Sequence, residues 1–263
     1  MNNRTIIIAL VISISTVVLL SVASTEAWAL LSLPKHIIAF WPADGNATDV
    51  TGHGHNGTLV GGVTFGPART NQAFFFNGTN GFVKVGSLGI FNTNKPFSIV
   101  AWVKPTSSIL HDNSSRVILQ EGATGSNTPY DKFMVGFALG RATESGVLSL
   151  EIGATQTFSQ VVYVPTLVPA NKWSFVAATY DGSQTAAGMK LYINGIAQST
   201  ATLGSGFTGT ATSRDQWSIG AEGYAPTPVD SFNGGIDDVK VFSCALNSTQ
   251  VAAQFHGNNR ATC

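Results

Sequence analysis

Two neighbouring stretches decide the fold: residues 173–182 read WSFVAATYDG, and residues 189–195 read MKLYING. Both have the β-branched, aromatic and small residues of strands. The dipeptide Asn194-Gly195 then separates the runs Lys190–Ile193 and Ala197–Thr202. A two-residue type I′ turn needs positive φ at both central positions, which Asn and Gly adopt most readily. We therefore expect these two runs to pair as an antiparallel hairpin.

The rest of the chain after Ala29 follows the same pattern, with short β-type runs separated by Gly, Asn, Pro and Asp at intervals of about 8–12 residues. Helical periodicity is almost absent. In Phe97–Lys104 apolar side chains fall on both faces, which indicates a strand buried on both sides. The further predicted strands are Ile37–Trp41, Thr58–Phe65, Gln72–Phe76, Phe82–Val85, Arg116–Gln120, Phe133–Leu139, Val147–Ile152, Gln160–Val164, Trp173–Tyr180, Gln216–Ile219 and Phe232–Phe242.

One short helix is expected near the C-terminus. Asn247 or Ser248 is suited to cap its start, and Gly257 is suited to end it. Over and just before this span, apolar residues recur with roughly helical spacing: Leu246, Val251, Ala252 and Phe255.

Three ordered segments carry a family resemblance. Residues 36–59 (HIIAFWPADGNATDVTGHGHNGTL) place a tryptophan strand before an acidic turn and an Asp-x-Thr-Gly-x-Gly loop; residues 173–195 form the hairpin; residues 232–246 read FNGGIDDVKVFSCAL. Together they resemble the laminin-G-like branch of the concanavalin A-like jelly rolls. The resemblance implies an all-β sandwich of two antiparallel sheets, with the first and last strands adjacent. It names no ligand, because this fold hosts lectins, adhesion modules and glucanases.

The N-terminus has the parts of a secretory signal. Arg4 precedes an apolar run of 17 residues, Ile6–Val22, and Ala27 and Ala29 fit a small-residue cleavage site. We predict a signal peptide over residues 1–29 and a single jelly-roll domain over residues 30–263. The alternative is a retained membrane anchor, because this apolar run is close to the shortest that spans a bilayer.

Composition fits an exported protein with an uncharged surface. Charged residues make up 11% of the chain, and 14 basic and 14 acidic residues give a formal net charge of zero. This balance provides no electrostatic footprint for nucleic acid or for an anionic membrane surface. The chain has two cysteines, Cys244 and Cys263, which we expect to pair in an oxidising compartment.

Acceptor sequons for N-glycosylation recur in the mature region. Each has Ser or Thr two residues after the Asn and no proline between them. We predict a secreted or cell-surface glycoprotein modified at Asn46, Asn56, Asn77, Asn113 and Asn247.

The chain has no recognisable catalytic centre. Glycoside hydrolysis needs two carboxylates flanking the scissile bond, yet Glu144 and Glu151 are seven residues apart and fall on opposite faces of a continuous strand. Glu121 and Glu222 have no neighbouring carboxylate in the sequence. Hydrolase elbow, zinc-protease and phosphate-loop motifs are also absent.

Acidic residues gather where the resemblance brings the first and last strands together. Asp44 and Asp49 lie on the first loop, and Asp237 and Asp238 lie in the last strand. Carboxylate oxygens beside glycine-rich backbone are the ligands that Ca²⁺ selects. We predict a structural calcium site at these four aspartates. The alternative is that they cap turns and accept backbone hydrogen bonds.

Aromatic residues divide into core and surface sets. Trp41, Trp102, Trp173 and Trp217 lie in apolar strand patterns and are expected in the core. Tyr130 beside Asp131 and Tyr224 beside Glu222 are candidates for ligand contact. The leading hypothesis is a non-catalytic recognition module that binds a glycan or an extracellular protein. The alternatives are a structural surface glycoprotein without a small ligand, and a degenerate glycosidase relative.

Overall fold

The hairpin predicted at Asn194-Gly195 forms, but its second strand is shorter than the predicted run Ala197–Thr202. Strands β12 (Met189–Ile193) and β13 (Ile196–Ala197) pair antiparallel across it, and the turn residues have φ of 51° and 79°. The structure is a computed structural model that describes residues 36–89, 92–106, 115–122, 134–140, 146–155, 158–204, 206, 216–222, 228–258 and 263. The predicted signal peptide lies outside these residues.

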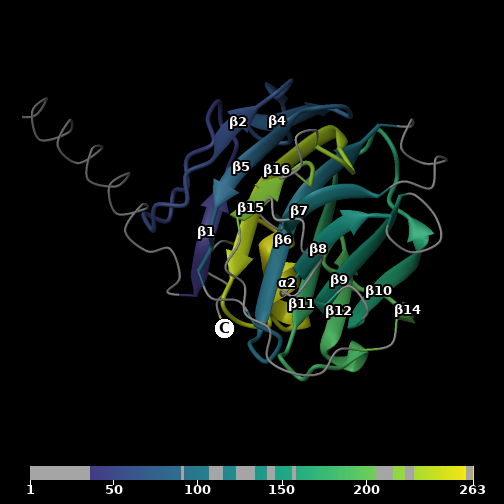
Figure 1. Ribbon diagram of the computed structural model, residues 1–263. Helices are drawn as coiled ribbons and strands as arrows, with labels where there is room; N and C mark the ends of the chain where they lie inside the picture. The colour runs from purple at the N-terminus through teal and green to yellow at the C-terminus, as the bar shows by residue number, and fades with distance from the viewer. Residues whose placement is uncertain are drawn as a thin grey trace, which may run out of the picture. The chain divides into compact units, whose positions relative to one another are not determined.

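The first sheet, sheet A, is antiparallel and includes both the hairpin and the last strand (Figure 1). Its strands follow the order β13-β12-β11-β6-β16-β4-β3, and β1 also pairs with β16. The predicted adjacency of first and last strands is therefore confirmed. The remaining bounds are β11 (Ser174–Tyr180), β6 (Phe97–Pro105), β16 (Asn233–Phe242), β4 (Gln72–Asn77), β3 (Thr64–Pro67) and β1 (Ile37–Trp41).

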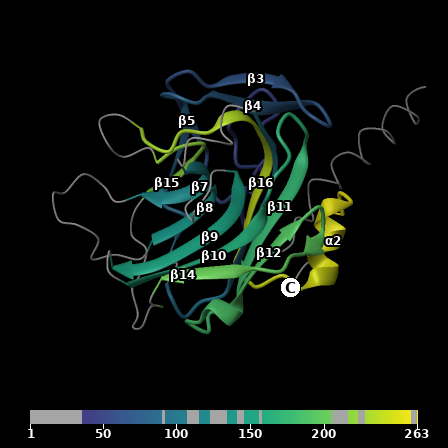
Figure 2. The same cartoon turned by 90° about the vertical axis from the view of Figure 1, so that its right-hand side faces the viewer.

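The second sheet, sheet B, packs against sheet A as the other layer of the sandwich (Figure 2). Its strands follow the order β14-β10-β9-β8-β7-β15-β5-β2. Their bounds are β14 (Ala201–Gly204), β10 (Phe158–Leu167), β9 (Val147–Thr155), β8 (Met134–Leu139), β7 (Arg116–Gly122), β15 (Gln216–Ile219), β5 (Phe82–Gly86) and β2 (Thr58–Val60). A short 3₁₀ turn, η2 (Ala186–Gly188), precedes β12.

The core lies between the two sheets and is formed by alternate side chains of each strand. Sheet A contributes Trp41, Phe74 and Ile236, and sheet B contributes Phe137 and Trp217, all fully buried. Large buried aromatic side chains of this kind supply most of the apolar area that stabilises a sandwich. The predicted all-β sandwich of two antiparallel sheets is confirmed.

The predicted C-terminal helix is α2 (Ser248–Phe255), which lies against the outer side of sheet A (Figure 2). Asn247 caps it: its side chain accepts from the Gln250 amide, and the Gln250 side chain accepts from the Asn247 amide. The Phe255 ring packs against Trp102 and Phe175 on the sheet. None of the described helices is long and apolar enough to cross a membrane.

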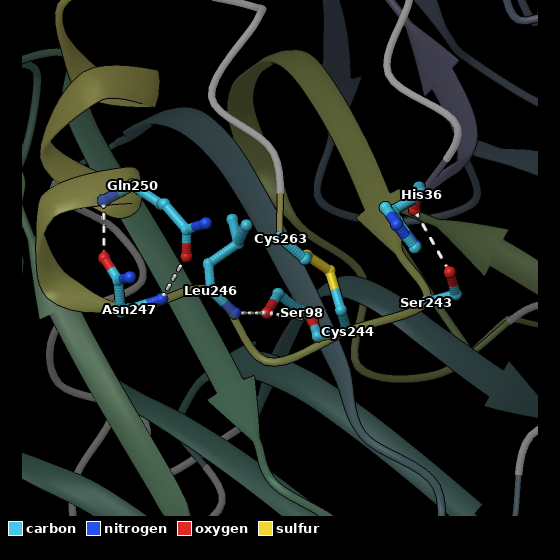
Figure 3. The surroundings of a disulfide bond; sticks show 8 residues. All are labelled: His36, Ser98, Ser243, Cys244, Leu246, Asn247, Gln250 and Cys263. Atoms are coloured by element: carbon cyan, nitrogen blue, oxygen red, sulfur yellow. Dashed lines mark hydrogen bonds between the residues drawn. A yellow bond between two sulfur atoms is a disulfide. The ribbon is translucent and has the colours of Figure 1, made fainter.

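A disulfide between Cys244 and Cys263 closes the segment that contains α2 (Figure 3). Its Cα atoms are 6.3 Å apart, and the two cysteines are separated by 19 positions. The Ser98 hydroxyl donates to the Cys244 carbonyl and accepts from the Leu246 amide, which fixes the start of this segment on β6. The predicted pairing of the two cysteines is confirmed.

Replacing both cysteines by alanine should lower the free energy of unfolding by about 3 kcal/mol, because the open loop gains conformational entropy in the unfolded chain. Denaturant titration of the double variant and of the wild type with and without reductant measures this change. Reductant should shift the midpoint of the wild type and leave that of the double variant unchanged. Equal midpoints for the oxidised wild type and the double variant would contradict the prediction.

Candidate functional site

The last strand changes its partner near its middle, and this junction brings together distant parts of the chain (Figure 1). Residues 233–236 of β16 pair with β4, and residues 239–242 pair with β1. Between the two partners lie Asp237 and Asp238, where the register with β6 also shifts. Asp238 has φ of 50°, which marks a β-bulge. The predicted aspartates of the last strand therefore lie at a break in the ladder.

Asp49, from the first loop, is a hydrogen-bond hub rather than a free carboxylate. Its side chain accepts from the amides of Phe40, Thr51 and His55 at 3.0–3.1 Å, and from the Thr51 hydroxyl at 2.7 Å. Burial by itself raises the pKa of this carboxyl, but the hydrogen bonds outweigh it and lower the pKa overall. The role that this geometry supports is to hold the loop against β1.

Asp44 connects the first loop to the turn between β3 and β4 by hydrogen bonds. Its carboxylate accepts from the Asn71 side chain at 3.1 Å and from the Gln72 amide at 3.2 Å. The same turn carries Arg69, whose guanidinium carbon lies 3.7 Å from the centroid of the Trp102 ring. This stacked cation was not anticipated from the sequence.

Charges at the junction interact through space. Asp237 is buried, and burial, followed by the charge of Asp238 and then of Asp44, raises its pKa to about 8. Burial also raises the pKa of Asp238, against the charges of Lys240 and Arg69. Lys240 is itself buried, which lowers its pKa. Three of the four predicted calcium ligands are thus electrostatically coupled.

The Lys240 ammonium lies 3.3 Å from Gln254 Oε1 and 4.5 Å from the centroid of the Phe40 ring. A hydrogen bond and a cation–π contact thus partly replace the hydration that it loses. Within the part of the chain that the structure describes, no three His, Cys, Asp or Glu side chains are arranged to hold a metal ion.

A half-buried aromatic pair lies beside this cluster on the outer face of sheet A. The rings of Phe75 and Trp173 are 6.4 Å apart between centroids and nearly perpendicular, at 82°. Each ring lies where a neighbouring glycine has no side chain. A Cβ on Gly235 would come within 2.6 Å of Trp173, and one on Gly66 within 2.9 Å of Phe75. The two glycines therefore let the rings lie close to the backbone of the sheet. We call Phe75 and Trp173 the aromatic platform.

The sheet register shows that the platform faces away from the core. Phe75 is opposite Gly235, and Gly235 is opposite Lys104. Directly paired residues share one face of a sheet. Their neighbours Phe74, Ile236 and Val103 all point into the core. Trp173 was expected in the core, and it is instead only half-buried because it precedes β11 and turns outward.

The described glutamates do not form a pair on one sheet face. Glu151 is opposite Gly136 on the outer face of sheet B, whereas Glu121 is opposite the core residue Trp217 and is buried. Glu222 lies outside the named strands, in an isolated bridge with Val229. Glu144 lies outside the described residues.

Some of the predicted site residues also lie outside the described residues: Tyr130, Tyr224 and Asn113. The other four sequon asparagines are exposed: Asn46, Asn56, Asn77 and Asn247. The Asn77 side-chain amide already donates to Asn80 Oδ1 at 2.7 Å. Their glycosylation stays a prediction.

This arrangement of sheets defines a jelly roll with a charged and aromatic patch on one outer face. A laminin G family model, described as concanavalin A-like lectin/glucanases superfamily, matches residues 77–252. The chain belongs to this superfamily. A comparison with curated protein sequences finds no match.

Several solved structures share the fold. Domain 4 of AbnA, an extracellular arabinanase of Geobacillus stearothermophilus solved with arabinotriose, matches with a TM-score of 0.57 and 19% identity over 82% of this chain and 97% of that chain. The binding domain of Paraclostridial Mosquitocidal Protein 1 matches with a TM-score of 0.62 and 15% identity, over 86% of this chain and 53% of that one.

The binding domain of botulinum neurotoxin serotype D/C matches with a TM-score of 0.60 and 18% identity, again over 86% of this chain and 53% of that chain. The protein thus spans about half the length of these toxin binding domains. At these identities the likeness establishes the jelly-roll fold.

Stability should depend on pH through Asp237. Between its unfolded pKa of 3.8 and its folded pKa of about 8, the folded chain keeps a proton that the unfolded chain has lost. Stability must therefore fall as the pH rises through this range. Asp237→Asn should flatten this slope and raise the unfolding temperature at pH 8. Thermal unfolding across pH 4–8 tests this, with exposed Asp181→Asn as the control. A slope that Asp237→Asn leaves unchanged would count against it.

Proposed function

We propose that this protein is an exported, non-catalytic carbohydrate-binding module, and that the aromatic platform contacts the sugar. The observation that carries the proposal is the half-buried pair Phe75 and Trp173, which lies over backbone glycines on the outer face of sheet A. Aromatic rings with one end buried and one end accessible suit the apolar faces of sugar rings.

Polar groups beside the platform provide the other half of sugar recognition. Arg69 is exposed and stacked on Trp102, and Trp102 is directly opposite Asp237 in the sheet. Charged groups of this kind can form hydrogen bonds with the hydroxyl groups of a sugar, and these bonds orient the sugar and make its binding specific. Because Asp44 fixes the turn that carries Arg69, the cation is positioned before any ligand arrives.

The comparisons support the same function. One neighbour in fold is a domain of an arabinanase solved with arabinotriose, and others are toxin binding domains. Export is supported by the disulfide, because such bonds persist in oxidising compartments. The proposed partner is therefore an extracellular glycan.

A structural calcium remains part of the proposal. Asp44, Asp237 and Asp238 interact electrostatically at the junction, and a cation that drew their carboxylates together would relieve their mutual repulsion. The role would be to fix the bulge and the first loop, with no direct contact to the sugar. Asp49 is occupied by four hydrogen-bond donors of its own loop and β1, so it would support the site from a distance.

Trp173→Ala should weaken binding of a neutral oligosaccharide by up to about tenfold, because stacking on one aromatic ring contributes on the order of 0.5–1.5 kcal/mol. Arabinotriose is the first probe. Isothermal titration calorimetry measures the affinity. Gly235→Ala should also weaken binding, because its methyl group displaces the Trp173 ring without removing it.

The matched control is Tyr163→Ala, which removes another half-buried aromatic ring, in β10 of the other sheet. It should leave the affinity unchanged. If a glycan array detects ligands whose affinities are the same for Trp173→Ala and the wild type, the platform is not the sugar site.

Calcium should raise the unfolding temperature of the wild type, because a metal that binds only the folded state stabilises it. Asp238→Asn should reduce this increase. Differential scanning fluorimetry with calcium and with chelator gives the readout. If neither calcium nor chelator changes the unfolding temperature, the protein has no structural calcium site.

A further inference from the structure

Two lysines border the aromatic platform. Lys104 of β6 is directly opposite Gly235, the residue under the Trp173 ring, and it is half-buried. Lys172 precedes Trp173 and is exposed. Lys104 faces the same side of the sheet as Phe75 and Gly235, because paired residues share a face. The platform therefore has a lysine within its own row of side chains.

The nearby aspartates interact with other cations. The charges that act on Asp237 are those of Asp238, Asp44 and Lys240, and Asp238 interacts with Lys240 and Arg69. Lys104 is in neither set. Across the residues that the structure describes, Lys104 and Lys172 have no ion-pair partner. Within this part of the chain, no carboxylate is therefore paired with the positive charge at the platform.

We propose that the platform selects an acidic polysaccharide, with a uronate carboxylate of the ligand accepting from the Lys104 ammonium while a sugar ring stacks on Trp173. This inference rests on the proposed carbohydrate-binding function and narrows its ligand class. The complementarity is local, because the chain as a whole has a formal net charge of zero.

The charge of the ligand makes this contact selective. Lys104 is half-buried, and a lysine in this setting buries its methylene stem and keeps its ammonium in water, where a ligand carboxylate can reach it. A neutral sugar offers only hydroxyl oxygens, whereas a uronate offers a charge-assisted hydrogen bond of roughly twice the strength. The platform supplies the stacking that both kinds of ligand share.

The experiment compares polygalacturonate with its fully methyl-esterified form, which keeps the sugar ring and removes the charge. The wild type should bind the acidic polymer about tenfold more tightly, as expected for one charge-assisted hydrogen bond. This preference should shrink as sodium chloride rises. Lys104→Gln should abolish the preference, because the acidic polymer should bind about tenfold more weakly and so about as weakly as the esterified one.

The control is Lys84→Gln, because Lys84 is an exposed strand lysine on the outer face of sheet B. It should keep the full preference, and circular dichroism should show that both variants are folded. Equal binding of the two polymers by the wild type would overturn the acidic selectivity, whereas the sensitivity of that binding to Trp173→Ala would still support a carbohydrate module. Failure of both polymers and of the glycan array would overturn both proposals.

Discussion

The architecture depends on how β16 satisfies its backbone hydrogen bonds. β16 lies inside sheet A, and buried backbone groups need partners along both edges. β6 pairs with one edge on both sides of the bulge, whereas β4 and then β1 pair with the other edge. The change of partner occurs at Asp237 and Asp238, where the chain bulges. β1 ends at this junction and β4 begins close to it. The loop that follows β1 and the turn that precedes β4 therefore meet at one point.

Most of the fold could be predicted because it follows from local chemistry. Period-2 patterning located the strands, and β1 and β15 have the predicted bounds. Two predicted runs each divide into two strands: Thr58–Phe65 becomes β2 and β3, and Ala197–Thr202 lies across β13 and β14. In both cases one piece belongs to sheet A and the other to sheet B. Residue patterns report a pleated, half-buried surface, and they do not report which sheet provides the partner.

The candidate site could be predicted only in part. The resemblance placed Asp44 near Asp237 and Asp238, and the structure couples their charges. It could not show that the Asp49 carboxylate accepts hydrogen bonds from its own loop and from β1, or that Arg69 stacks on Trp102, because these contacts depend on tertiary geometry. One sequence signal for the platform was present in Gly66 and Gly235. A glycine within a strand often marks the close approach of another group.

The platform is positioned by the sheet instead of by a separate loop, and this affects what it can bind. Phe75 belongs to β4, and Trp173 directly precedes β11, so neighbouring strand hydrogen bonds fix the backbone that carries both rings. A preorganised site loses little side-chain entropy when a ligand binds. Its selectivity must then come from fixed groups around the rings. Lys104 shares their row, whereas Asp238 interacts with Lys240 and Arg69, so the row that carries the rings also carries a cation that this aspartate does not engage.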